Sequence, residues 1–119
     1  MTTALLLVDH GSVLSEANET LHQMVALVQE RRPHMLVEGA HMDLARPTIA
    51  EAISSCLDRG ATTIVVHPYM LSPGKHASKD IPQIIEKAAA MYPHVCFRVT
   101  EPLGVHKGIC DAVLERAGL

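Results

Sequence analysis

Short, largely apolar runs alternate along the chain with longer segments in which apolar residues recur every three or four positions. The apolar runs occupy residues 4–8, 35–42, 62–66 and 95–100. Runs of this length, rich in Val, Ile and Leu, are typical of strands buried on both faces of a parallel sheet. The intervening segments have the spacing of helices with one buried face. The pattern therefore predicts four strands and four helices in alternation.

Capping residues and prolines set the expected helix ends. We predict helices over residues 15–32, 46–60, 80–92 and 107–117. Thr48 and Glu51 have the spacing of a capping box, and Gly60 is placed to end the same helix. Asp80 is expected to cap the third helix, with Pro82 in its first turn, where a missing N–H is tolerated.

The order βαβαβαβα predicts an α/β fold. We expect a four-stranded, all-parallel sheet with helices on both faces and a flavodoxin-like strand order, because a helix that joins two parallel strands packs back onto their sheet. The chain is expected to form one domain over residues 1–119, since domains of roughly 100–150 residues are the commonest.

Charge and cysteine content narrow the possible partners. The net charge of −3 disfavours nucleic acid and anionic membranes, which do not attract an acidic protein. No apolar stretch is long enough to span a bilayer, and the run at residues 4–8 is too short for a secretory signal. Cys56, Cys96 and Cys110 show no Cys-x-x-Cys pairing, which is typical of free thiols in a reducing compartment. We therefore expect a cytoplasmic protein.

Histidine is the unusual residue type in this chain. Five of the eight histidines fall at the carboxyl ends of predicted strands or in the loops that follow: His10, His41, His67, His76 and His106. Ligands of open parallel sheets bind outside the carboxyl ends of the strands, and neutral imidazole is a common ligand of cobalt, nickel, iron and zinc. The pattern favours an open divalent-metal site with His10 and His76 as the leading ligands. A strand-end histidine can also be a hydrogen-bonded structural residue, and the spacing leaves both interpretations open.

Two further segments at the same edge carry polar residues suited to a ligand. The connection from His67 to Lys79 is long for so compact a chain, and long loops of this kind are usually functional. It precedes a helix N-terminus, which would suit a ligand rich in carboxylate or phosphate. Asp43 follows the second strand, where it can also simply begin a turn, and Gly11-Ser12 can serve only as a tight turn into the first helix.

Four parts of the sequence carry a resemblance to a known family. They are residues 7–12 with 16–18, residues 42–48, residues 68–82 and residues 101–106. The third is the most specific, because Leu-Ser-Pro-Gly-Lys-His at residues 71–76 leads into Asp-Ile-Pro at residues 80–82. Over nearly the whole chain these segments resemble the small class II tetrapyrrole chelatases, in their single-domain, CbiX-like form.

The resemblance implies an enzyme that inserts cobalt, with nickel or iron(II) as alternatives, into sirohydrochlorin, in cobalamin- or siroheme-type biosynthesis and without an organic cofactor. It implies that His10 and His76 face each other as metal ligands and catalytic residues. Asp43 is expected to orient a histidine or to relay a proton. The residues expected to meet the carboxylates at the rim of the ring are Ser12, Ser72, Gly74, Lys75 and Lys79.

The resemblance also implies a homodimer, because longer relatives carry two such domains. A tetrapyrrole is a disc that needs walls on both faces, and ligand sites usually bury most of their ligand. We therefore expect a two-fold interface near the site, built from the loops after the first and third strands and the adjoining helix surface.

Three positions depart from the residues common in this family, and two other functions remain open. Asp9 stands where Gly is common, Val13 where Arg is common, and Asp43 where Glu is common. One alternative is a non-catalytic metal- or tetrapyrrole-binding module derived from a chelatase. The other is a flavodoxin-like protein that binds phosphate or a nucleotide through Gly11-Ser12 and the loop 72–79. The chain has no Gly-x-Gly-x-x-Gly or Walker pattern to support the second alternative.

Overall fold

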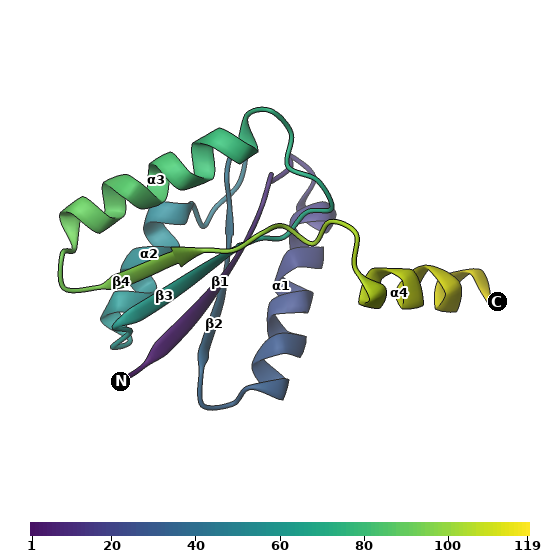
Figure 1. Cartoon of the computed structure of the whole chain (residues 1–119), viewed down its shortest axis with the longest axis horizontal. Helices are drawn as coiled ribbons and strands as arrows, with labels where there is room; N and C mark the ends of the chain where they lie inside the picture. Colours follow the sequence, from purple (N-terminus) through teal and green to yellow (C-terminus); the bar gives the residue numbers. More distant parts are fainter.

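A computed structural model describes all 119 residues and has the predicted alternation of strands and helices. The strands are β1 (Thr3–Asp9), β2 (Leu36–His41), β3 (Thr63–Pro68) and β4 (Cys96–Val99). The helices are α1 (Ser15–Arg31), α2 (Ile49–Asp58), α3 (Ala77–Met91) and α4 (Lys107–Ala117). All strand pairs are parallel, in the order β2-β1-β3-β4 (Figure 1). The predicted fold class and strand order are confirmed.

The main core lies between the sheet and the pair α2 and α3. Strand residues alternate between the two faces of a sheet, and every second residue of β1 and β3 points toward these helices. The buried residues on this side include Leu6, Val8, Ile64 and Val66 from the strands and Ile53, Cys56, Ile81 and Ile85 from the helices. This one-sided core holds the carboxyl ends of β1 and β3 against the start of α3, where the polar residues gather.

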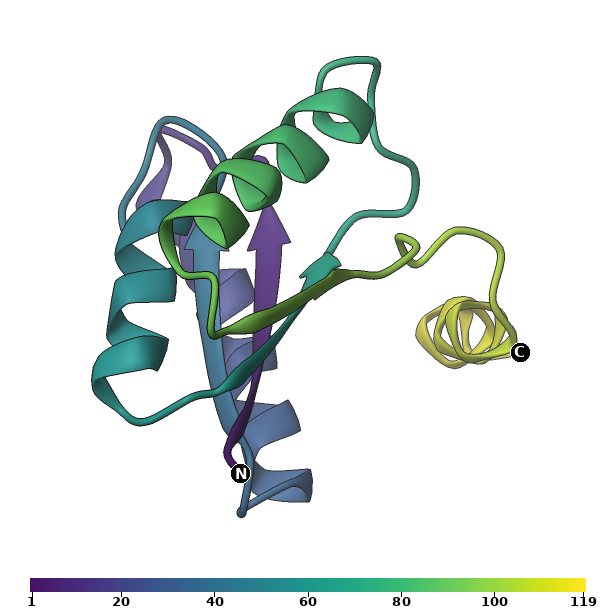
Figure 2. The same cartoon turned by 60° about the vertical axis from the view of Figure 1, so that its left-hand side comes forward.

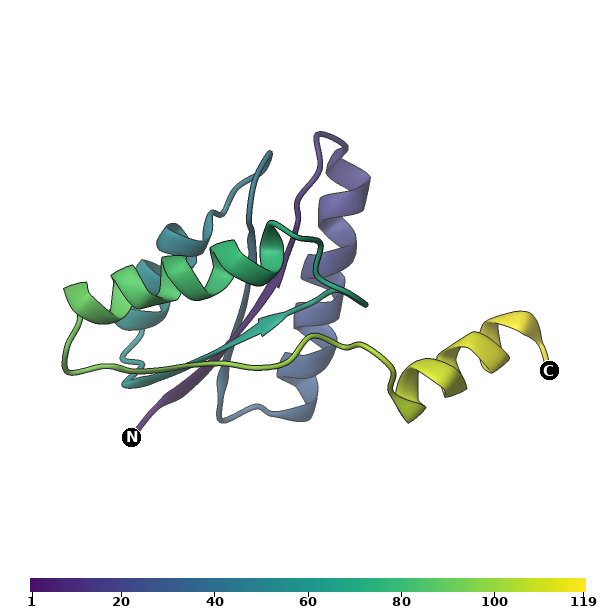
Figure 3. The ribbon, with the colours of Figure 1, turned by 45° about the horizontal axis from the view of Figure 1, so that its top comes forward.

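The opposite face of the sheet is covered only in part. α1 packs on β2 and β1, with Leu21 buried, while Met24, Val25 and Val28 stay half-buried. α4 extends away from the body of the molecule and does not lie on the sheet (Figures 1 and 2). Figure 3 shows the same separation from a third direction. Helices therefore lie on both faces, as predicted, but β3 and β4 have a helix on one side only.

The helix ends follow the capping signals with one exception. The capping box of Thr48 and Glu51 is present at the start of α2, and Gly60 follows its end with φ +94°. The prediction that Asp80 caps the third helix was wrong. α3 begins at Ala77, which is buried in the core, and the Asp80 N–H already donates to the His76 carbonyl at 2.7 Å. Pro82 accordingly lies inside the helix rather than in its first turn.

Stability at acid pH is expected to depend on Glu51. Its hydrogen bond from the Arg46 guanidinium, followed by that from the Thr48 N–H, lowers the pKa of Glu51 from 4.5 to about 2. A carboxyl whose pKa is lower in the folded state stabilises the fold above its unfolded pKa, and that contribution is lost as the pH falls through the folded value. Between pH 4.5 and 2 the wild type should therefore lose stability more steeply than Glu51→Gln in urea unfolding. Equal slopes would contradict this assignment.

Candidate functional site

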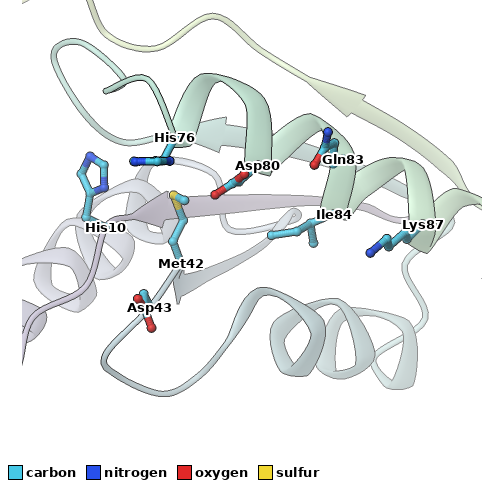
Figure 4. A pocket seen from close by; sticks show the side chains of 8 residues that line it. All are labelled: His10, Met42, Asp43, His76, Asp80, Gln83, Ile84 and Lys87. Carbon is cyan, nitrogen blue, oxygen red and sulfur yellow. The ribbon is translucent and has the colours of Figure 1, made fainter.

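Two of the predicted site histidines meet at one hollow. His10 follows β1, and His76 ends the β3–α3 loop directly before α3. Both line a hollow of about 400 Å³ at the carboxyl edge of the sheet, together with Met42, Asp43, Asp80, Gln83, Ile84 and Lys87. Figure 4 shows the imidazoles of His10 and His76 at one end of this hollow, with Asp80 beside His76 and Lys87 at the far end. Three of the residues predicted at the carboxyl ends of the strands, His10, His76 and Asp43, therefore line the same hollow.

Four of the eight residues that line the hollow lie on one face of α3, and the sequence pattern did not identify that face. His76, Asp80, Gln83, Ile84 and Lys87 follow one another at intervals of four, three, one and three residues. This is the spacing of residues on one side of a helix. The Asp80 carboxylate lies one helical turn beyond His76, where it can accept a proton or bind a cation. The Lys87 ammonium, at the other end of the hollow, can bind an anionic group.

Backbone contacts join the loop that carries His10 to the loop that carries Asp43. The Asp43 N–H donates to the His10 carbonyl at 3.0 Å, and the Met42 N–H donates to the Asp9 carbonyl at 2.9 Å. Gly11 has φ +87°, and a Cβ at this position would lie 1.9 Å from the Asp43 carbonyl oxygen. Asp43 Oδ1 accepts from the Leu44 N–H at 2.8 Å, so one carboxylate oxygen shapes the turn and Oδ2 can face the hollow.

His41 is fully buried behind these loops, and both of its ring nitrogens have partners. Its Nδ1 lies 2.5 Å from Asp9 Oδ1, and its Nε2 lies 3.1 Å from His22 Nε2 on α1. An ionised Asp9 accepts from His41 Nδ1–H, which leaves Nε2 to accept from His22 Nε2–H. His41 therefore fastens the ends of β1 and β2 to α1 and has no lone pair for the hollow. Asp9, a departure from the family pattern, is its carboxylate partner.

Removing the Asp9 carboxylate is expected to destabilise the protein through His41. Asp9→Ala leaves a buried imidazole N–H without its acceptor, which typically costs about 1–3 kcal/mol. Asp58 at the exposed end of α2 provides the matched control, because Asp58→Ala should change the free energy of unfolding by less than about 0.5 kcal/mol. Chemical denaturation of both variants measures the difference. Equal stabilities would show that the Asp9–His41 contact contributes nothing.

The other two histidines predicted at this edge, one in β3 and one directly before α4, serve local structure. Thr100 Oγ1 donates to the Glu101 carbonyl at 2.9 Å and lies 2.8 Å from His67 Nδ1, which must then be the donor. Burial lowers the pKa of His67, so its ring is neutral at pH 7. His106 Nδ1 accepts from the Gly108 N–H at 2.9 Å and thereby caps α4. Neither residue lines the hollow that holds His10 and His76.

The residues predicted to bind the substrate lie outside the hollow. The backbone of Ser12 exchanges two hydrogen bonds with the Asn18 side chain, at 2.9 and 2.7 Å, and its hydroxyl accepts from the Leu14 N–H at 3.0 Å. Ser12 thus shapes the turn into α1. The remaining four are exposed on the β3–α3 loop or the first turn of α3: Ser72, Gly74, Lys75 and Lys79. They do not line the hollow, although they lie within four residues of His76 along the chain.

The donor set limits what kind of metal site the chain can form. Nowhere do three or more His, Cys, Asp or Glu side chains converge as ligands for one ion. Two imidazoles alone leave coordination positions open, which suits an exchangeable ion better than a closed structural centre.

No helix is both long enough and apolar enough to cross a membrane.

Comparisons with known proteins show which proteins the chain resembles as a whole. The model of the family described as CbiX matches residues 4–118. The chain is 39% identical to the chloroplastic sirohydrochlorin ferrochelatase of Arabidopsis thaliana, over 94% of this chain and 50% of that protein. It is 34% identical to the sirohydrochlorin cobaltochelatase of Sulfolobus acidocaldarius, over 95% of this chain and 88% of that protein.

A solved structure gives the same fold. The sirohydrochlorin chelatase SirB of Bacillus subtilis subspecies spizizenii, in complex with cobalt, superposes with a TM-score of 0.89 at 30% identity. The superposition covers 99% of this chain and 50% of the SirB chain. The chain thus spans about half the length of the Arabidopsis and Bacillus proteins.

Proposed function

Because the chain belongs to the CbiX family, we propose that it inserts a divalent metal ion into a sirohydrochlorin-type tetrapyrrole. The observation that carries the proposal is the pair of imidazoles, His10 and His76, on one hollow at the carboxyl edge of the sheet. Cobalt is the leading metal substrate, with nickel or iron(II) as alternatives, and the sirohydrochlorin chelatases among the relatives include both cobalt and iron enzymes. The expected place of the reaction is cobalamin- or siroheme-type biosynthesis.

The chemistry of insertion suits two neutral imidazoles. The ion must be held while some of its positions stay open, so that ring nitrogens can displace water. Two pyrrole N–H protons must leave for each divalent ion that enters the ring. When the ion passes to the ring, His10 and His76 regain the lone pairs that held it, and each can then accept one proton. The two bases therefore match the two protons in number.

The residues around the two histidines can serve proton transfer and binding of the ring carboxylates. Asp43 and Asp80 line the hollow and can orient an imidazole or take its proton onward. Lys87 at the far end of the hollow, and the exposed Lys75 and Lys79 on either side of His76 in the sequence, can bind carboxylates at the edge of the ring. The two carboxylates in the hollow disfavour a phosphate ligand, which counts against the nucleotide-binding alternative. A reducing compartment such as the cytoplasm suits the free thiols of this chain.

The carboxyl edge also has the apolar surface expected of a homodimer that closes over the ring. Each of the four loops at this edge carries at least one exposed large aliphatic side chain: Val13, Leu14, Leu44, Leu71 and Val105. Leu44 is in the left-handed region with φ +67°, a conformation that costs a residue with a Cβ about 1–2 kcal/mol. A strained, exposed leucine next to the site is typical of a functional surface. We place a second copy against this edge.

The metal is tested by anaerobic incubation of the protein with sirohydrochlorin and each of Co²⁺, Ni²⁺ and Fe²⁺. The absorbance change of the ring gives the rate, after subtraction of the uncatalysed rate for the same ion. We expect acceleration by the protein for at least one ion, with the largest factor for Co²⁺. Acceleration for none of the three would reject the proposed function.

A further inference from the structure

Met42 is the one residue of the hollow whose side chain carries a sulfur donor. It follows β2 directly, and its N–H donates to the Asp9 carbonyl at 2.9 Å, which fixes its backbone. The side chain is half-buried, because it packs against the core and also lines the hollow. Figure 4 shows it directed toward the side of the hollow where His76 and Asp80 lie. A thioether is therefore held in the same hollow as the two imidazoles.

Packing alone does not require sulfur at this position. Leucine has nearly the volume of methionine and usually replaces it in a core at little cost. What the sulfur adds is a lone pair at the hollow. This lone pair is available without loss of a proton, whereas imidazole, thiol and carboxylate donors must be deprotonated before they bind a metal. Met42 therefore stays a donor when His10 and His76 accept protons.

The type of donor affects which ions the hollow prefers. Asp43 and Asp80 line it as well, and carboxylate oxygens suit hard ions such as Mg²⁺ and Mn²⁺. The affinity of divalent ions for a given site rises from Mn²⁺ through Fe²⁺ and Co²⁺ to Ni²⁺, and a soft thioether contributes little to the binding of a hard ion. Two imidazoles and a thioether therefore favour Co²⁺ and Ni²⁺, whereas imidazoles and carboxylates alone would also accept Mn²⁺.

We propose that the Met42 sulfur is a third protein donor to the metal substrate, beside His10 and His76, and that it favours Co²⁺ and Ni²⁺ over Mn²⁺ and Mg²⁺. The proposal rests on the proposed function and names a specificity-determining residue of the same site. It adds a donor from outside the His, Cys, Asp and Glu side chains, of which no three converge on one ion. Three neutral donors still leave coordination positions open for the ring nitrogens.

Metal binding to the full-length protein, without tetrapyrrole, measures the contribution of the sulfur. The Co²⁺ dissociation constant is measured by titration calorimetry, and bound Mn²⁺ by the loss of the electron paramagnetic resonance signal of the free ion. Met42→Leu should raise the Co²⁺ dissociation constant roughly tenfold, which corresponds to about 1.4 kcal/mol, and leave Mn²⁺ binding unchanged. The fold should be kept, because the substitution conserves the volume of the side chain.

Met91→Leu is the matched control for this substitution. Met91 is 70% exposed at the end of α3 and does not line the hollow. The variant makes the same chemical change away from the site, so it should bind both ions as the wild type does. A loss of Co²⁺ affinity in Met42→Leu that Met91→Leu shares would contradict the proposed role of Met42.

A direct measurement of the bond needs no variant. Met42 is the only one of the six methionines that lines the hollow. Protein grown with selenomethionine is loaded with one equivalent of Co²⁺ per chain, and X-ray absorption is recorded at the cobalt edge. We expect a selenium atom among the nearest neighbours of cobalt, and we expect selenomethionine-labelled Met42→Leu to lack it.

Two results would overturn the proposal. One is a cobalt spectrum of the wild type that contains nitrogen and oxygen neighbours but no selenium. The other is an equal loss of Co²⁺ and Mn²⁺ affinity in Met42→Leu, which would mean that the side chain only positions the imidazoles by packing. Turnover of sirohydrochlorin separates these failures from that of the proposed function. A wild type that metallates many rings without a cobalt–selenium contact keeps the activity and loses only the Met42 donor.

Discussion

His10→Ala is expected to lower the rate of metallation by a factor of about 10²–10⁴, which is the usual contribution of a positioned proton acceptor. The variant also loses one of two imidazoles available to hold the ion, so its affinity for Co²⁺ should fall as well. The fold should be unaffected, because the His10 side chain is exposed and such substitutions usually change the free energy of unfolding by less than about 0.5 kcal/mol. His76→Ala should behave in the same way.

The matched control for both variants is His34→Ala. His34 is exposed in the turn between α1 and β2, at the opposite edge of the sheet, and its loss should leave metallation unchanged. Rates with sirohydrochlorin and Co²⁺ should be compared with unfolding curves of the same preparations. If His10→Ala and His76→Ala metallate at the wild-type rate, the two imidazoles are not the catalytic pair.

Gly11→Ala is expected to damage both the stability and the site. A Cβ at this position meets the Asp43 carbonyl oxygen at 1.9 Å, which no side-chain rotation can relieve. In addition, φ +87° at Gly11 is unfavourable for alanine by about 1–2 kcal/mol. The loops that carry His10 and Asp43 must separate, so we expect at least about 2 kcal/mol of lost stability and a melting temperature lower by roughly 10 °C.

Gly74→Ala is the control for this substitution. A Cβ at Gly74 meets nothing within 4 Å, and its φ is not in the left-handed region. The variant should match the wild type in thermal unfolding. Gly11→Ala should also lose most of its metallation rate at a temperature where it is still folded. A Gly11→Ala protein as stable and as active as Gly74→Ala would mean that the two loops are not tied together as described.

The strands, the strand order and the placement of His10 and His76 follow from the sequence because they depend on local patterns. An apolar run fixes a strand, alternation with helices fixes parallel pairing, and parallel pairing puts every strand end on one edge. The face of α3 was missed for a related reason. With the helix placed to begin after Asp80, His76 falls in a loop, and its helical spacing to Asp80 and Lys87 cannot be recognised.

The separation of His41 from His10 depends on which face of the sheet each strand residue meets. A shift of one residue in a strand reverses the side to which a side chain points. His41 is the last residue of β2 and faces α1, where His22 and Asp9 satisfy both ring nitrogens. Position near a strand end does not reveal this, because the partners come from two other elements.

α4 illustrates the opposite case. Its limits, residues 107–117, agree with the prediction, since the helical pattern is local. Where the helix lies depends on the two hydrogen bonds that tie Leu103 and Gly104 to the β3–α3 loop. Those contacts join segments some thirty residues apart, so no local sequence pattern predicts them.

Turnover is the measurement that tests the central claim most directly. The protein is incubated under anaerobic conditions with Co²⁺ and a large excess of sirohydrochlorin, and the metallated ring is counted per protein chain. A chelatase that uses His10 and His76 should convert many rings per chain, and His10→Ala should convert about 10²–10⁴ times fewer in the same time. A spectral change that stops at about one ring per site, and that His10→Ala shares, would show a tetrapyrrole-binding module and contradict the proposed enzyme.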